Sequence, residues 1–115
     1  MNASRMNPIL PVSDLPHVVA VLTSILGRRA TFVDGERWAQ FDLGGGRLAL
    51  AAGGAAEDGP ALAVKVSRLD ATVARLRADG YRVGDTGRGP HERSATVTVD
   101  GATGWSVVLY EPLEP

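Results

Sequence analysis

The sequence contains no cysteine and only two histidines, His17 and His91. Without cysteine, the chain cannot form a disulfide framework, a zinc–thiolate site, a thiol redox motif or a cysteine nucleophile. Two imidazoles also leave little material for a metal site built mainly on histidine. The composition therefore argues against a metal centre based on cysteine or histidine.

An excess of one charge sign is also lacking, since 12 basic residues face 13 acidic ones and the formal net charge is −1. The basic residues, 11 Arg and one Lys, are scattered along the chain and form no patch for nucleic acid. The longest apolar runs, at 18–22 and 48–52, are far shorter than the roughly 20 residues that span a bilayer. The first residues do not resemble a signal peptide. We therefore expect a cytoplasmic protein with no nucleic-acid or membrane partner.

Apolar residues, in contrast, make up 44% of the 115 residues, enough for one modest core, so we expect a single domain over 1–115. Hydrophobic periodicity divides it into modules at 6–52 and 61–111, joined by a small, polar linker at 53–60. The first module predicts a strand at 7–12, a helix ending at Gly27, and strands at 29–34, 37–43 and 47–52. The second predicts a strand at 61–66, a helix from Leu69 to Asp79, and strands at 81–83, 92–99 and 105–110.

The two modules therefore repeat one order of elements. A shift of 54 residues superposes Leu15 on Leu69, and a shift of 56 superposes the strand at 37–43 on residues 93–99. Such internal repeats determine the architecture of a chain. The fold class that we expect is α+β, with two tandem βαβββ modules.

Three segments make the sequence similar to a known superfamily. Residues 12–15 with 25–27 resemble its opening strand and helix, residues 64–81 the start of its second module, and residues 97–111 its closing hairpin. On these segments the chain resembles the vicinal oxygen chelate superfamily, which includes glyoxalase I, extradiol dioxygenases, fosfomycin-resistance enzymes and bleomycin-resistance proteins. The resemblance implies that the two modules curl into a mixed-sheet cup. One departure is the closing turn, where Asp-Gly-Ala-Thr-Gly at residues 100–104 replaces the usual Asp-Pro-x-Gly.

Enzymes of this superfamily hold a divalent metal in the cup, with ligands from the first and last strand of each module. The resemblance maps these four positions onto Asn7, Leu50, Ala61 and Val108. Divalent ions are bound by imidazole and carboxylate lone pairs, which this set does not supply. We therefore expect no metal, no other cofactor and no catalytic residue that the sequence can name.

Four other residues bear on the site. Glu111 ends the last strand, but strand alternation turns it away from Val108, so we expect a solvated carboxylate. His17 is predicted at the surface of a helix and His91 at the rim of the cup. Trp105 alternates with Val107 and Leu109, which predicts packing in the core against a helix.

Without a metal the cup would still be a concave place for a small molecule. Trp38 offers a stacking surface, and Asp42 and Lys65 can orient charged groups. In the alternative interpretation Trp38 is a core residue and Lys65 extends to solvent. Strand alternation gives as candidate ligand-binding residues Asn7, Trp38, Gln40, Asp42, Leu50, Lys65, Val108 and Tyr110, with Ile9, Leu48, Ala61, Ala63, Thr96 and Ser106 beside them.

The resemblance is to the bleomycin-resistance branch without the metal ligands. It implies a metal-independent protein that binds a small organic molecule, with drug sequestration as one use, and that forms a homodimer. One alternative is a metal-dependent lyase or dioxygenase with a non-standard site, in which His91 acts with Asp42 or Glu111. Another is a structural or regulatory module whose cup is filled by its own side chains. The balance leans away from an enzyme, and the identity of the ligand stays open.

Overall fold

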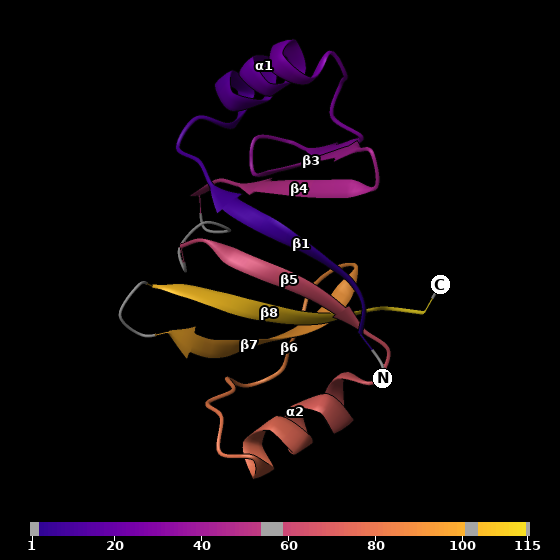
Figure 1. Cartoon of the computed structure of the whole chain (residues 1–115), viewed down its shortest axis with the longest axis vertical. Helices are drawn as coiled ribbons and strands as arrows, with labels where there is room; N and C mark the ends of the chain where they lie inside the picture. Colours follow the sequence, from indigo (N-terminus) through magenta and orange to yellow (C-terminus); the bar gives the residue numbers. More distant parts are fainter. Residues whose placement is uncertain (1–2, 54–58, 101–103, 115) are drawn as a thin grey trace. The chain divides into compact units, whose positions relative to one another are not determined.

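The computed structural model of the chain describes residues 3–53, 59–100 and 104–114. The chain divides into two compact units, Asn7–Pro60 and Ala61–Pro115, with Met1–Met6 joining the second. Most of the predicted linker at 53–60, and most of the departing turn at 100–104, lie outside the described residues. Figure 1 shows that each unit carries a helix beside its own strands.

The first unit contains a helix and a four-stranded sheet. Its elements are β1 (Ala3–Pro11), of which residues 7–11 belong to this unit, α1 (Leu15–Leu26), β2 (Phe32–Asp34), β3 (Trp38–Leu43) and β4 (Gly46–Ala51), and its strands follow the order β2-β3-β4-β1. β1 runs parallel to β4, and the other pairs are antiparallel. The Asp14 side chain caps α1 by accepting a bond from the His17 N–H at 3.2 Å. The helix ends at Gly27, whose φ of 66° is left-handed.

The second unit repeats this arrangement. Its elements are β5 (Ala61–Val66), α2 (Leu69–Ala78), β6 (Gly87–Arg88), β7 (Glu92–Asp100) and β8 (Trp105–Pro112), in the strand order β5-β8-β7-β6. β5 runs parallel to β8, and β7 runs antiparallel to both of its neighbours, β8 and β6. The α+β class and the two βαβββ modules are therefore confirmed. Neither α1 nor α2 is long and apolar enough to cross a membrane.

Each unit has its own hydrophobic core between the helix and one face of the sheet. Leu15 begins α1 and is buried with Ala39, Phe41 and Leu50 from β3 and β4. In the second unit, the corresponding clusters join Leu69 and Val73 of α2 to Val66, Ala95, Val97 and Leu109 of the sheet. In both units the apolar residues of the strands alternate with residues on the opposite face, as the period of two predicts.

The short strand predicted at 81–83 is wrong, because the second strand of this module is Gly87–Arg88. Val83 makes only an isolated bridge to Val97. Tyr81 is still part of the helix end, since its N–H donates to the Leu76 carbonyl at 3.0 Å. Apart from the Val83 bridge, strand pairing after α2 therefore begins only at Gly87, further along the chain than the apolar residues at 81–83 predict.

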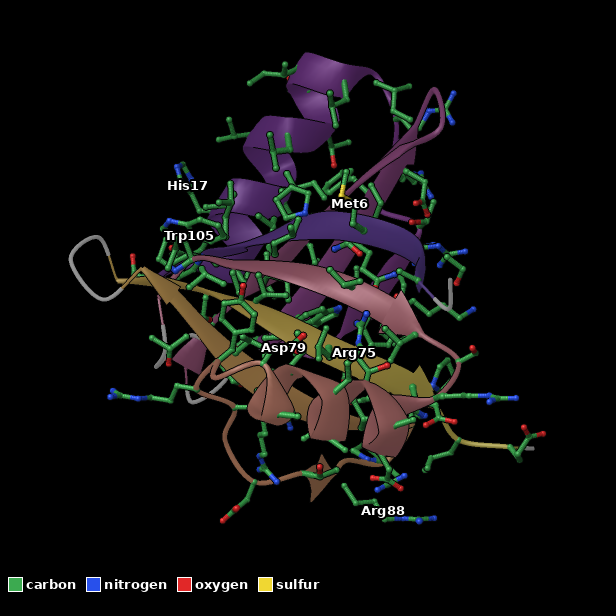
Figure 2. All side chains as sticks on the ribbon, turned by 60° about the horizontal axis from the view of Figure 1, so that its bottom comes forward. Met6, His17, Arg75, Asp79, Arg88 and Trp105 are labelled. Carbon is green, nitrogen blue, oxygen red and sulfur yellow. The ribbon has the colours of Figure 1, made fainter. Side chains whose placement is uncertain are left out.

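The prediction that Trp105 packs in the core is also wrong. Trp105 is 40% exposed and pairs with Asp100 at the first position of β8. The core of this unit takes Val107 and Leu109 from β8 instead. Alternation placed Trp105 on the correct face, but that position lies beyond the reach of α2 (Figure 2).

Candidate functional site

The candidate site lies on the face of each sheet that turns away from its helix. We call these the first open face, in Asn7–Pro60, and the second open face, in Ala61–Pro115. Strand pairing arranges the side chains of each face in rows across three neighbouring strands. Rows follow one another about 7 Å apart along a strand, and strands lie about 4.8 Å apart.

The first open face is aromatic at one end and neutral overall. One row joins Trp38 to Ala51 and Pro11, and the next joins Gln40 to Ala49 and Ile9. The Trp38 Nε1–H donates to Gln40 Oε1 at 3.0 Å, so these two side chains hold one another along β3. Ala51 and Ala49 are 1% and 0% exposed, so the half-buried Trp38 and Gln40 provide the reachable surface.

Asp42 begins the polar end of the first open face and is fully engaged. Its Oδ1 accepts from Arg47 Nε at 2.7 Å, and its Oδ2 accepts from the Thr31 hydroxyl at 2.7 Å. A carboxylate that already accepts several bonds is a poor general base and a poor cation ligand. Asp42 and Arg47 also cancel one another's charge, which leaves this face without net charge.

The prediction that Leu50 lies on this face is wrong. Leu50 pairs with Ala39 and is 1% exposed in the core beneath α1. Leu48 is on the same helix side. Val108 pairs with Ala63. The first-module counterpart of Ala63 is Ile9, and Ile9 pairs with Ala49. The first-module equivalent of Val108 is therefore Ala49, one position from the expected residue.

Asn7 belongs to the first open face by its alternation with Ile9. It is 5% exposed, and its Nδ2–H donates to the neighbouring Pro8 carbonyl at 3.2 Å. A buried amide is retained in a strand only when its polar atoms find partners. The other three positions to which the resemblance assigns metal ligands have aliphatic side chains, so Asn7 is the single polar residue among the four.

The second open face differs from the first in being rich in hydroxyl groups. Its successive rows are Lys65–Tyr110–Ser94, Ala63–Val108–Thr96 and Ala61–Ser106–Thr98. Lys65, Val108 and Tyr110 thus share one face, on two consecutive rows of the neighbouring strands β5 and β8, as alternation predicts. All three are half-buried.

Two side chains of the second open face have unmet polar groups. The Lys65 ammonium takes part in no ion pair or hydrogen bond among the residues that the structure describes. The Ser106 Oγ is buried and lacks a hydrogen-bond partner in the same part of the chain. These are the groups that sequence alternation places correctly but whose unpaired state only the structure reveals.

The residues present do not fit the divalent metal that the resembled enzymes hold. Asn7 contributes one amide, and Ala49, Ala61 and Val108 contribute no side-chain donor. Within the described ranges, no three His, Cys, Asp or Glu side chains gather as a metal site would require. His17 in the first turn of α1 (Figure 2) and His91 before β7 are both exposed.

Glu111 has a structural role that the sequence did not predict. Alternation correctly places it on the helix side of β8, but its carboxylate is not simply solvated. Its Oε1 accepts the N–H of Leu69 at 3.1 Å and so caps the first turn of α2. The N-cap residue Arg68 makes no side-chain cap bond in the described chain. A non-capping residue at the start of a strong helix was the available signal.

An ion pair lies beside this cap. Arg93 of β7 binds Asp70 of α2 with its two terminal nitrogens at 2.7 and 3.2 Å. The hydrogen bond from Arg93 lowers the pKa of Asp70, and the same bond raises the pKa of Arg93, with a smaller contribution from Glu111. Glu111, Arg93 and Asp70 therefore join α2 to its sheet and are turned away from the second open face.

Comparison with known proteins identifies the fold. No family model and no curated protein sequence matches the chain. Among solved structures, methylmalonyl-CoA epimerase from Mycobacterium tuberculosis is 21% identical with a TM-score of 0.71, over 98% of this chain and 89% of that one. A glyoxalase/bleomycin resistance protein/dioxygenase superfamily member from Vibrio splendidus is 14% identical with a TM-score of 0.71, over 93% and 97%. A protein described as NAD-dependent benzaldehyde dehydrogenase from Legionella pneumophila is 13% identical with a TM-score of 0.80, over 95% and 100%.

At such identities the likeness concerns the fold and not the activity. The three proteins differ in the functions that their descriptions give. The chain has the fold of the glyoxalase/bleomycin resistance protein/dioxygenase superfamily, as the resemblance of its sequence predicted.

Proposed function

We propose that the protein binds a small organic molecule without a metal, in the manner of the metal-free members of this fold. The observation that carries the proposal is the donor set at the four strand positions where the resembled enzymes hold their metal. Asn7 is polar, whereas Ala49, Ala61 and Val108 have aliphatic side chains. Metal sites in proteins use at least three protein donors, so these positions favour an organic ligand.

Each open face, taken by itself, has groups that bind such a ligand. On the first, Trp38 presents a half-buried indole, which stacks well on planar molecules. The second has hydroxyl groups and one ammonium around the small side chains of Ala63 and Val108. Small-molecule sites typically combine apolar walls with a few polar groups that fix orientation.

The proposal includes sequestration of an antibiotic or a similar organic compound, with release and no conversion. It also includes a cytoplasmic homodimer, as in the resembled branch. Native mass spectrometry of the purified protein measures the number of subunits and detects any organic molecule that co-purifies. A monomer at micromolar concentration would contradict the dimer while leaving ligand binding to the next test.

The chain's two tryptophans allow a direct test of ligand binding. Trp105→Phe leaves Trp38 as the single indole, and the matched variant Trp38→Phe leaves only Trp105. A panel of planar fragments based on naphthalene, quinoline and indole is titrated against both variants, with and without EDTA. We expect at least one fragment to quench Trp38 fluorescence saturably, with the same dissociation constant in EDTA and no effect on Trp105.

Three results would contradict the proposal. The first is the absence of saturable quenching of Trp38 by every fragment up to millimolar concentration. The second is binding that is lost in EDTA and restored by zinc, nickel, manganese or iron. The third is conversion of a bound fragment, followed by proton NMR of the mixture, which would revive the metal-dependent lyase or dioxygenase with a non-standard site.

A further inference from the structure

Lys65 is the only lysine of the chain and lies on the second open face. Lys65 of β5 pairs with Tyr110 of β8, which in turn pairs with Ser94 of β7. Lys65 is half-buried, and among the described residues it has neither an ion-pair nor a hydrogen-bond partner. A partly desolvated ammonium group gains most from an anion that completes its hydrogen bonds.

The nearby acidic groups do not fill that role. Asp70 and Glu111 belong to the helix side of this unit, where they are bound by Arg93 and the Leu69 N–H. Glu92 lies on the second open face, one row beyond Ser94 and two strands from Lys65. Its Oε1 lies 2.8 Å from the point where a Cβ on Gly89 would stand, so it turns toward the segment before β7.

The repeat provides an internal comparison for this position. The counterpart of Lys65 on the first open face is Pro11, which pairs with Ala51. The charged groups of the first open face, Asp42 and Arg47, neutralise one another at 2.7 Å. Lys65 of the second open face, in contrast, has no ion-pair partner among the described residues.

The surroundings of Lys65 fit the rest of an organic anion. The Tyr110 hydroxyl and the Ser94 hydroxyl stand in the same row and are neutral donors that an oxyanion accepts. The next row, about 7 Å along the strands, holds the aliphatic Ala63 and Val108. A ligand with an anionic head and an apolar body of that length matches one polar row followed by one apolar row.

We propose that the second open face binds an organic carboxylate, with its anionic group on Lys65 and Tyr110 and its apolar body over Ala63 and Val108. This inference rests on the proposed function and specifies its ligand class. The ammonium and the phenol fix the head group, and the aliphatic row accepts a short chain or a ring.

The test uses a pair of probes that differ only in charge, 4-phenylbutyrate and 4-phenylbutanamide. Because Lys65 is the sole lysine, reductive methylation with ¹³C-formaldehyde gives one side-chain NMR signal besides that of the N-terminus. We expect the carboxylate to shift the Lys65 signal and to bind about tenfold more tightly than the amide, since hydrogen bonds to charged groups are the stronger ones.

Three variants separate this site from general charge effects. Lys65→Met keeps the apolar stem and should reduce carboxylate affinity to that of the amide, whereas Lys65→Arg should retain most of the preference. Arg75→Met removes the same charge from the exposed side of α2 (Figure 2) and should leave both affinities unchanged. Backbone NMR spectra of all three variants establish that the fold is intact.

Equal affinity for the two probes, or a Lys65→Met variant that keeps the preference, would overturn the carboxylate proposal. Binding of neither probe would overturn it as well. The Trp38 quenching experiment judges the proposed function separately, because it uses neutral fragments and the other open face. A protein that passes the Trp38 test but shows no charge preference binds organic ligands of another class.

Discussion

Ser106 has a buried hydroxyl oxygen with no hydrogen-bond partner in the described part of the chain. Leaving such a group unpaired costs about 1–3 kcal/mol of folding free energy. We therefore expect Ser106→Ala to keep or raise the free energy of unfolding, by up to about 1 kcal/mol, measured by urea unfolding. Ser94→Ala, in the polar row of the same face, is the control and should change it by less than about 0.5 kcal/mol. A loss above about 1 kcal/mol in Ser106→Ala would mean that this hydroxyl is hydrogen-bonded in solution.

Single residues also show where sequence reasoning fails. The predicted alternation of side chains along β4 is correct, but the predicted faces are shifted by one residue. Leu48 and Leu50 lie on the helix side, whereas Ala49 and Ala51 lie on the open face. The cause is an irregularity between Thr98 and Asp100, which lengthens the path from β7 to β8 in the second module. A bulge of this kind adds one residue to a strand and reverses which side chains lie on the open face. Nothing in the sequence marks its position.

At the scale of elements, the two helices begin in different ways. Asp14 caps α1 from the adjacent position in the chain, and aspartate is among the residues that favour this position. Its counterpart before α2 is Arg68, and the cap comes from Glu111, 42 residues away. The carboxylate also lies near the positive end of the helix dipole, where a negative charge is stabilising. The start of α2 thus depends on the last strand of its module.

We expect Glu111→Ala to lower the free energy of unfolding by about 1 kcal/mol, the usual cost of losing a helix cap. Glu111→Gln keeps an oxygen that accepts the Leu69 N–H and should lose less. Glu114→Ala, at an exposed carboxylate near the chain end, is the matched control and should have almost no effect. Hydrogen exchange of the Leu69 amide locates the effect. An unchanged exchange rate in Glu111→Ala would show that the cap does not hold in solution.

At the scale of the whole molecule, the repeat explains both what the sequence predicts and what it leaves out. The fold follows from two matched patterns of strand and helix periodicity, which are local properties. Trp38, Gln40, Lys65 and Tyr110 fall on the predicted faces because each lies in a regular part of its strand. The role of Glu111 and the unpaired state of Lys65 depend on contacts between distant segments, which periodicity does not encode.

The stability of the molecule should fall in acid, in part through one ion pair. The hydrogen bond from Arg93 lowers the pKa of Asp70 below its ordinary value of 3.8, so the folded chain binds fewer protons than the unfolded chain in that range. The Asp70–Arg93 pair contributes fully to the free energy of unfolding at pH values above the ordinary pKa of Asp70. This contribution disappears as the pH falls through the lowered pKa of the folded chain. We expect the unfolding free energy of Asp70→Asn to decline less between pH 5 and about pH 3 than that of the unmodified protein. Asp79→Asn, at the exposed C-cap of the same helix, is the control (Figure 2). Parallel pH curves for Asp70→Asn and the unmodified protein would mean that the Asp70–Arg93 contact does not persist in solution.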